Sequence, residues 1–202
     1  DRDFETGDGK IEGKNLLQAY KEELADFAES KGKKWDKKIV VDSLGGSGKI
    51  LPEILEKLGA EIIDISEKDT PYVDPPEPRP ENLEKLEKAV KSHNADLGLS
   101  NDLDADRVTV YYKDRFLTGD EVFSVLSSCI DGEIVASIDT SQALEELNDS
   151  VSYTRVGDPF VMDKALEIDA ALAGEPNGHY AFTDFVPYHS GILSAAIISG
   201  LD

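Results

Sequence analysis

Short apolar segments alternate with single amphipathic helices along most of this chain, and this alternation constrains the fold more than any other feature. In the first half, apolar strands are expected at residues 39–41, 61–65 and 96–99, and the segments 50–58 and 81–91 between them have helical spacing. Strands that are joined by single helices form right-handed βαβ units, in which the strands lie parallel. The first half of the chain therefore predicts an α/β domain built on a mainly parallel sheet.

The same rhythm begins again after Asp131-Gly132. Strands are expected at 133–138, 151–155 and 170–173, and helices at 142–147 and 160–167. Before this point, a strand at 108–112 turns back on residues 115–117, so the first sheet is expected to be mixed.

We therefore predict an α/β fold with two consecutive α/β domains, each a mixed, mainly parallel sheet flanked by helices. The expected divisions are residues 1–13 as a polar tail or linker, residues 14–130 as the first domain and residues 131–202 as the second. Both domains fall within the ordinary size range.

Charge excludes several classes of partner. The chain carries 42 acidic and 21 basic side chains, a net charge of −21, so it repels nucleic-acid phosphates and anionic lipid. We expect no nucleic-acid partner and no membrane, because the longest apolar segment, residues 192–201, is well short of the ~20 residues of a membrane helix. The acidity fits either ordinary solubility or a salt-rich cytoplasm.

A single cysteine, Cys129, is present. It cannot form an internal disulfide and provides no cysteine cluster for a metal. The expected location is therefore the cytoplasm.

The strongest local motif follows the expected strand 96–99. Asp102, Asp104 and Asp106 occupy alternate positions, and alternate side chains of an extended segment face the same way, so the three can converge on a hard cation such as Mg²⁺. An EF-hand is excluded, because Arg107 and Lys113 stand where that loop needs Gly and Glu. A solvated acidic turn is the alternative, but Arg107 next to a cation site favours a phosphate ligand.

A second motif, residues 174–179, joins two apolar segments. Its glycines allow a tight turn, and Glu175, Asn177 and His179 offer hydrogen-bond donors and acceptors suited to sugar hydroxyls. A plain hydrophilic hairpin is the alternative. Gly157, in the turn before the helix 160–167, could admit a ligand to the helix N-terminus.

Two further segments imitate functional motifs. The glycine-rich turn 44–49, followed by Asp64, resembles a dinucleotide fingerprint, but its glycine spacing does not match, so a tight turn is favoured over a nucleotide-binding module. Ser92-His93-Asn94 suggests a nucleophile with a base, but adjacent residues on a helix face different ways. We interpret it as a C-terminal helix cap.

In combination, the chain resembles the α-D-phosphohexomutase superfamily of phosphoglucomutases, phosphomannomutases and phosphoglucosamine mutases. Four segments match in the family's order. They are residues 38–48, residues 95–107 with the D-G-D-A-D-R type metal loop, residues 154–161 with the T-x-V-G-D-x-F-V pattern, and residues 174–179 with the G-E-x-S-G-H pattern.

The resemblance implies an isomerase that transfers phosphate reversibly between the 1- and 6-positions of a hexose through a bisphosphorylated intermediate. Magnesium is the implied cofactor and a hexose phosphate the implied substrate. The implied roles are magnesium binding by Asp102, Asp104 and Asp106, phosphate contact by Arg107, and hexose binding by Glu175 and Asn177 with His179 nearby.

The chain departs from the family at several positions. Leu103 replaces a glycine of the metal loop, which would matter if that position needed positive φ. Asn177 replaces a serine, Pro159 stands where relatives are often basic, and Ser190 replaces an aspartate but can still cap the next helix.

The family's phosphorylated serine lies in a first domain and its substrate-phosphate loop in a fourth, and neither motif occurs here. The chain thus resembles domains two and three only. We expect a fragment or split subunit that is inactive alone and needs the missing domains or a partner chain. A non-catalytic α/β subunit is the alternative.

Overall fold

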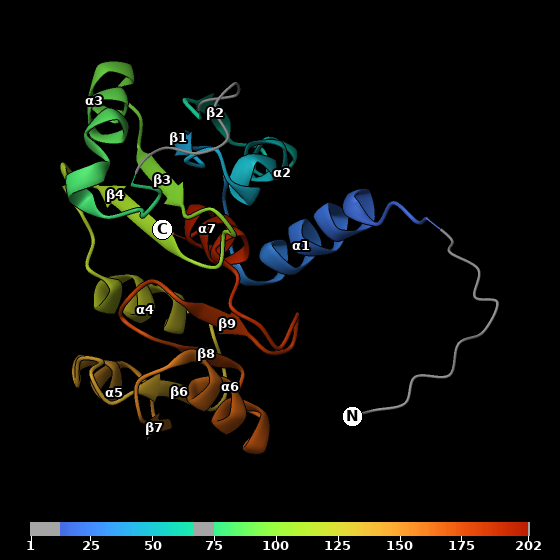
Figure 1. The fold of residues 1–202 in the computed structure, drawn as a ribbon, viewed down its shortest axis with the longest axis vertical. Coiled ribbons are helices and arrows are strands. Elements are labelled where there is room, and N and C mark those ends of the chain that lie inside the picture. The colour runs from blue at the N-terminus through green and yellow to red at the C-terminus, as the bar shows by residue number, and fades with distance from the viewer. Residues whose placement is uncertain (1–12, 67–74, 202) are drawn as a thin grey trace, which may run out of the picture.

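The computed structural model describes residues 13–66 and 75–201, and two sheets form the body of this part of the chain (Figure 1). The first sheet has the order β2-β1-β3-β4-β5 and the second the order β7-β6-β8-β9. The strands are β1 Lys38–Asp42, β2 Glu61–Asp64, β3 Leu97–Asn101, β4 Val108–Tyr112, β5 Arg115–Phe116, β6 Ile134–Ser137, β7 Val151–Thr154, β8 Leu172–Gly174 and β9 Tyr180–Phe182. The α-helices are α1 Leu17–Lys31, α2 Leu51–Leu58, α3 Glu84–His93, α4 Gly119–Ser127, α5 Ala143–Leu147, α6 Asp158–Glu167 and α7 Gly191–Ser199, with short 3-10 turns η1 Ser47–Ile50 and η2 Pro80–Asn82.

Both sheets are mixed, as the sequence predicts. In the first, β1 pairs in parallel with β2 and β3, and β4 runs antiparallel to β3. In the second, β6 pairs in parallel with β7 and β8, and β9 runs antiparallel to β8. The predicted α/β fold with two mixed sheets flanked by helices is confirmed.

Alternate residues of β1 divide the first core between the two faces of its sheet. Ile39 and Val41 pack in the core formed with α1, α2 and α7, whereas Val40 packs with Leu86 and Val90 of α3 on the opposite face. This arrangement follows from the period of two along a strand, and burial on both faces explains why β1 is a continuous apolar run.

The second sheet is covered in the same way. Val135 and Ala173 pack against α6, and Ala136, on the other face, belongs to the core that contains α4, α5 and α7. One continuous core therefore reaches from the first sheet to the second.

Helix α7 lies in that shared core (Figure 1). All of its residues are buried, and it contacts α1, α2 and α4 as well as β3, β4 and β9. Its C-terminal turn is held by the segment before β1, where Trp35 donates through Nε1 to the Ala196 carbonyl at 2.9 Å and Lys37 donates to the Ser199 carbonyl at 3.0 Å. The longest apolar segment of the sequence is thus an internal helix, and none of the helices in the described residues has the length and apolarity needed to span a bilayer.

Two helix ends are as the sequence predicts, and one is not. Ser190 caps α7 by accepting from the Leu193 N–H at 3.2 Å, and Asn94 ends α3 with a φ of 49°. Helix α6 begins at Asp158, not at Phe160, because Gly157 with a φ of 125° turns the chain directly into the helix. The sequence also predicts a proline-rich loop at residues 71–80, of which residues 71–74 lie outside the described residues.

Candidate active site

The aspartate loop, residues 102–107, follows β3 at its C-terminal end, and the structure brings its three carboxylates together. Asp102, Asp104 and Asp106 each offer one oxygen, and these oxygens lie within 4.8 Å of one another. The loop is closed locally, because Asp102 Oδ1 accepts from the Arg107 N–H at 3.2 Å and Ala105 adopts a φ of 62°. Positive φ therefore falls at Ala105, and Leu103 in place of the family's glycine imposes no such strain.

The glycine-rich turn 44–49 packs against the backbone of the aspartate loop. Gly46 lies so close to it that a Cβ there would be 2.5 Å from the Cα and the carbonyl oxygen of Leu103. The Ser47 N–H donates to that same carbonyl at 2.7 Å. The glycines thus allow the turn to pack against the aspartate loop, which is the tight-turn role that the sequence favours over nucleotide binding.

Residues 174–179, which we call the hexose loop after the role that the resemblance implies, join β8 to β9 in the second sheet. It closes as a tight hairpin in which the Glu175 N–H donates to the His179 carbonyl at 2.9 Å and Gly178 has a φ of 104°. Asn177 lies exposed at its tip. An isolated bridge between Arg107 and His179 attaches this hairpin to the aspartate loop, so the two motifs meet although they are about 70 residues apart in sequence.

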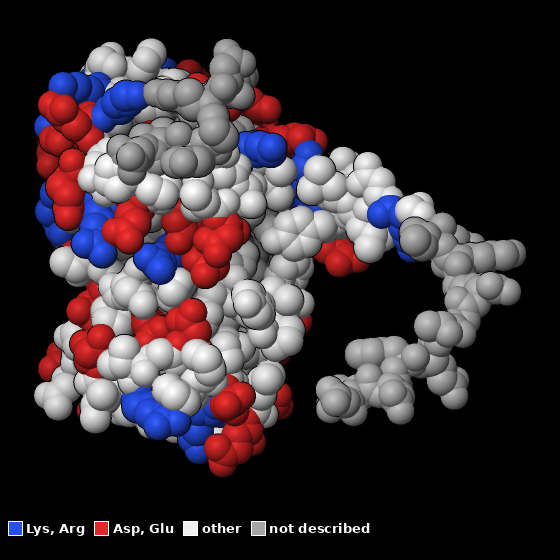
Figure 2. Space-filling model, viewed as in Figure 1, with Lys and Arg blue, Asp and Glu red and all other residues white. Residues whose placement is uncertain are grey.

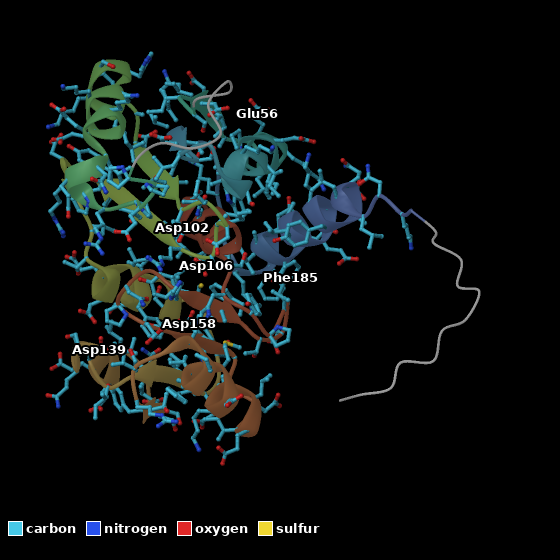
Figure 3. The ribbon with its side chains drawn as sticks, in the orientation of Figure 1. Glu56, Asp102, Asp106, Asp139, Asp158 and Phe185 are labelled. Carbon is cyan, nitrogen blue, oxygen red and sulfur yellow. The ribbon has the colours of Figure 1, made fainter. Side chains whose placement is uncertain are left out.

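Side chains from both loops converge at this junction, and Figure 3 shows Asp102 and Asp106 of the aspartate loop on the side that faces Asp158. Arg107 Nε lies 3.0 Å from His179 Nε2, to which it donates, and 3.4 Å from Asp102 Oδ2. His179 Nε2 also lies 3.2 Å from Asp106 Oδ1. Figure 2 shows acidic side chains on both sides of this junction. A carboxylate-rich site that contains one guanidinium suits a cation and a phosphate bound side by side.

Two residues of the site are missed by sequence reasoning. Asp158, the first residue of α6, places its Oδ1 3.0 Å from His179 Nδ1. The ring of His189 packs 5.1 Å from the ring of His179, centroid to centroid. The aspartate of the T-x-V-G-D-x-F-V match was a usable signal for Asp158, whereas nothing in the sequence around His189 indicates its place.

Gly157 contributes differently from a simple ligand contact. Its N–H donates to Glu175 Oε1 at 2.8 Å and so fixes that carboxylate. Glu175 is 1% exposed, and its other oxygen has no hydrogen-bond partner in residues 13–66 and 75–201. Direct contact of Gly157 with a ligand stays a prediction.

Three carboxyl groups of the site, those of Asp102, Asp158 and Glu175, have shifted pKa values. Burial raises the pKa of Asp102 to about 6, and the nearby charges of Asp106 and Asp104 act in the same direction. Burial also raises the pKa of Glu175, as does the neighbouring carboxyl group of Asp158. Burial opposes ionisation of Asp158, but the neighbouring Glu175 and His179 outweigh it and lower its pKa. These shifts are the expected result of several carboxylates sharing a partly buried site.

The aspartate loop suits a hard divalent cation. It offers oxygen ligands only, and Asp106 Oδ1 is buried without a hydrogen-bond partner in the described part of the chain. A cation would relieve both this unpartnered oxygen and the repulsion that raises the pKa of Asp102.

Comparison with protein families gives two adjoining matches. Residues 18–115 match the model "Phosphoglucomutase/phosphomannomutase, alpha/beta/alpha domain II", and residues 110–201 match the model of domain III of the same family.

Curated relatives include a probable phosphoglucosamine mutase of Methanothermobacter thermautotrophicus, 36% identical over 171 residues, which cover 81% of this chain and 38% of the relative. A phosphoglucomutase/phosphomannomutase of Thermococcus kodakarensis is 30% identical over 204 residues, 94% of this chain and 45% of the relative. The chain spans less than half the length of these relatives.

Solved structures give the same picture. A phosphoglucomutase/phosphomannomutase family protein of Burkholderia thailandensis matches with a TM-score of 0.84 and 26% identity, over 98% of this chain and 46% of that chain. A phosphomannomutase structure from Thermus thermophilus, described as putative, matches with a TM-score of 0.81 and 25% identity, over 95% of this chain and 48% of that chain.

Proposed function

Because this chain belongs to the phosphoglucomutase/phosphomannomutase family, whose domains II and III it matches, we propose that it forms the central portion of a phosphohexomutase. The whole enzyme would interconvert hexose 1-phosphates and hexose 6-phosphates. This portion would supply the magnesium-binding and hexose-binding loops, and other domains or a partner chain would supply the phosphoserine and the second phosphate site. The chain alone would then be inactive.

The junction of the aspartate loop with the hexose loop is the observation that carries this proposal. The Arg107–His179 bridge holds the two loops together, so a hexose at residues 174–179 would lie beside a cation at residues 102–106. Asp102, Asp104 and Asp106 would hold Mg²⁺. When bound, the ion would neutralise the negative charge that develops on a transferring phosphoryl group.

Side chains of this chain would bind the hexose and its phosphate. Glu175 Oε2 would accept a hydrogen bond from a hexose hydroxyl, because its partner Oε1 is already fixed by Gly157. Asn177 at the exposed tip of the loop would contact a second hydroxyl. Arg107 would face phosphate, since its Nε is held by His179 while its side chain is 35% exposed to solvent. Positioning of this kind supplies much of the catalysis in phosphoryl transfer.

The single cysteine, Cys129, is the reason for proposing a cytoplasmic enzyme. The oxygen-only ligand set is the reason for proposing Mg²⁺ rather than a softer metal.

Calorimetric titration with MgCl₂ tests the metal assignment. We expect one binding event in the native chain and a loss of affinity of at least about tenfold in Asp104→Asn, which removes one ligand charge from an exposed side chain. Asp163→Asn, on the solvent-facing side of α6, is the matched control. Equal Mg²⁺ affinity in native chain and Asp104→Asn would overturn the metal assignment. Mutase turnover by the isolated chain would overturn the proposal that other domains or a partner chain supply the phosphoserine.

A further inference from the structure

Helix α4 packs against the hexose loop at its first residue, Gly119. A Cβ built on Gly119 would overlap the carbonyl group of Pro176 and lie 2.9 Å from its Cα. Pro176 stands between Glu175 and Asn177, the two residues of the loop that would contact the hexose. The backbone of α4 therefore approaches the loop midway between its two proposed hexose contacts, at a distance that only glycine permits.

A hydrogen bond links the residue that follows the loop to the same glycine. The Tyr180 hydroxyl donates to the Gly119 carbonyl at 2.7 Å, from a side chain that is fully buried. The Tyr180 ring also lies 5.4 Å from the ring of Phe123 in α4, centroid to centroid. Burial raises the pKa of Tyr180, which keeps the hydroxyl protonated as the donor. Gly119 thus contacts the hexose loop at Pro176 and the start of β9 at Tyr180.

The start of α4 is itself fixed to the first sheet. Thr118 Oγ1 accepts from the Glu121 N–H at 3.2 Å, and the Thr118 N–H donates to Glu121 Oε2 at 2.8 Å, the reciprocal pair of a capping box. Glu121 also accepts two hydrogen bonds from the Arg115 guanidinium of β5, at 2.6 and 2.7 Å. Because the helix end is fixed in both ways, crowding at Gly119 would displace the loop rather than the helix.

The hexose loop is thus attached to two different parts of the molecule. The bridge at His179 joins it to the aspartate loop, and the close contact at Pro176 joins it to Gly119 of α4. Asn177 stands between these two attachments and Glu175 directly before them. The path of the backbone at both proposed hexose contacts therefore depends on α4 as well as on the aspartate loop.

We propose that Gly119 and Tyr180 are positioning residues, which hold the hexose loop in the conformation in which Glu175 and Asn177 bind the sugar. They act through the backbone of the loop. That the ligand is a hexose phosphate rests on the proposed function, whereas the attachment of the loop to α4 does not. A loop that leaves this conformation binds the ligand more weakly, because only the competent fraction of molecules binds.

Gly119→Ala tests the contact with Pro176. Alanine has the higher helix propensity, so a loss of loop structure in this variant must come from the added methyl group. We expect the amide resonances of residues 174–179 to shift in the free chain and the affinity for glucose 1,6-bisphosphate, measured by NMR titration, to fall at least about tenfold. The affinity for Mg²⁺ should stay within about twofold of native, because the aspartate loop is supported separately, by the turn at Gly46.

Tyr180→Phe tests the hydrogen bond, because it removes the hydroxyl and keeps the ring. The readout is hydrogen exchange of the Glu175 amide, which donates to the His179 carbonyl within the loop. If opening of the loop breaks the hydrogen bond to Gly119, its loss should raise this exchange rate by about two- to tenfold. If the hydroxyl serves only the core, amides of β6, an interior strand of the same sheet, should exchange faster by global unfolding while the Glu175 amide keeps its native rate.

Val125→Ala, at an exposed position of the same helix, is the matched control for a weakened α4. Circular dichroism verifies that each variant is folded, and Tyr180→Phe alone decides if Gly119→Ala does not fold. Native ligand affinity in Gly119→Ala, or a native exchange rate of the Glu175 amide in Tyr180→Phe, would overturn the positioning role. A native chain that does not bind glucose 1,6-bisphosphate, while the loop responds to both variants, would count against the proposed function alone.

Discussion

Gly46→Ala tests whether the glycine-rich turn shapes the aspartate loop. Gly46 has a φ of −90°, which alanine adopts without strain, so any effect must come from the added methyl group. That Cβ would lie 2.5 Å from Leu103 Cα and its carbonyl oxygen, where ordinary contacts are 3.4–4 Å. The aspartate loop would have to move away by about 1 Å, because both colliding groups are backbone.

The cost of this displacement has two parts. Overpacking of a well-packed contact costs about 1–3 kcal/mol, and loss of the Ser47 N–H to Leu103 hydrogen bond adds about 1 kcal/mol. For a chain of this size, each kcal/mol lowers Tm by roughly 2–4 °C. We therefore expect Tm to fall by several degrees and the Mg²⁺ affinity to fall with it, because the carboxylates of the loop no longer converge.

Thermal unfolding and calorimetric MgCl₂ titration measure both effects on the same samples. Gly13→Ala is the matched control, since a Cβ at Gly13 would meet nothing within 4 Å. If Gly46→Ala keeps both the native Tm and the native Mg²⁺ affinity, the turn does not support the loop and the reasoning is refuted.

Two further predictions concern the fold itself. Ile197→Ala in the shared helix α7 removes a fully buried side chain and should lower the free energy of unfolding by about 2–5 kcal/mol. Urea unfolding of the variant should still show a single transition, because both sheets lose part of the same core. Two separate transitions would contradict a shared core. The second of these predictions concerns pH and uses Glu121→Gln. The Arg115 side chain holds the pKa of Glu121 down to about 2. The contribution of this ion pair to the free energy of unfolding is therefore complete above about pH 4.5 and is lost as the pH falls towards 2. Because both side chains are solvent-exposed, that contribution should be below about 1 kcal/mol. The stability difference between native chain and variant, measured by urea unfolding, should shrink as the pH falls from 4.5 towards 2. A difference that stays constant would contradict the ion pair.

The fold was predictable because its elements carry strong local periodicity. Strands β1 and β6 are short apolar runs, and α2 and α3 have one apolar face each. The position of α7 was not predictable in this way. A helix that is apolar all round indicates burial but not which elements bury it, and here its neighbours come from both sheets.

In the candidate site, too, the local motifs were predictable and the contacts between distant segments were not. The aspartate and hexose loops are contiguous motifs, so the sequence indicates each of them, and the structure adds that they meet through Arg107 and His179. Asp158 and His189 reach the site through the turn before α6 and the segment before α7. Such contacts depend on long-range packing, which no local pattern records.

Leu103 shows how a local rule can mislead. A leucine where the family has a glycine suggests backbone strain, but positive φ in this loop falls at Ala105. The position that must be glycine for this loop is Gly46, more than 50 residues earlier in the chain, where a Cβ would collide with the backbone of Leu103.

The central claim is that the two loops form one binding site for a hexose phosphate. Backbone amide NMR during titration with glucose 1,6-bisphosphate and MgCl₂ tests it most directly, because even weak binding by these two sheets and their loops shifts resonances. The account predicts shifts concentrated at residues 102–107 and 174–179, reduced by Glu175→Gln and by Asp104→Asn. Shifts that cluster elsewhere, or that persist unchanged in both variants, would contradict it.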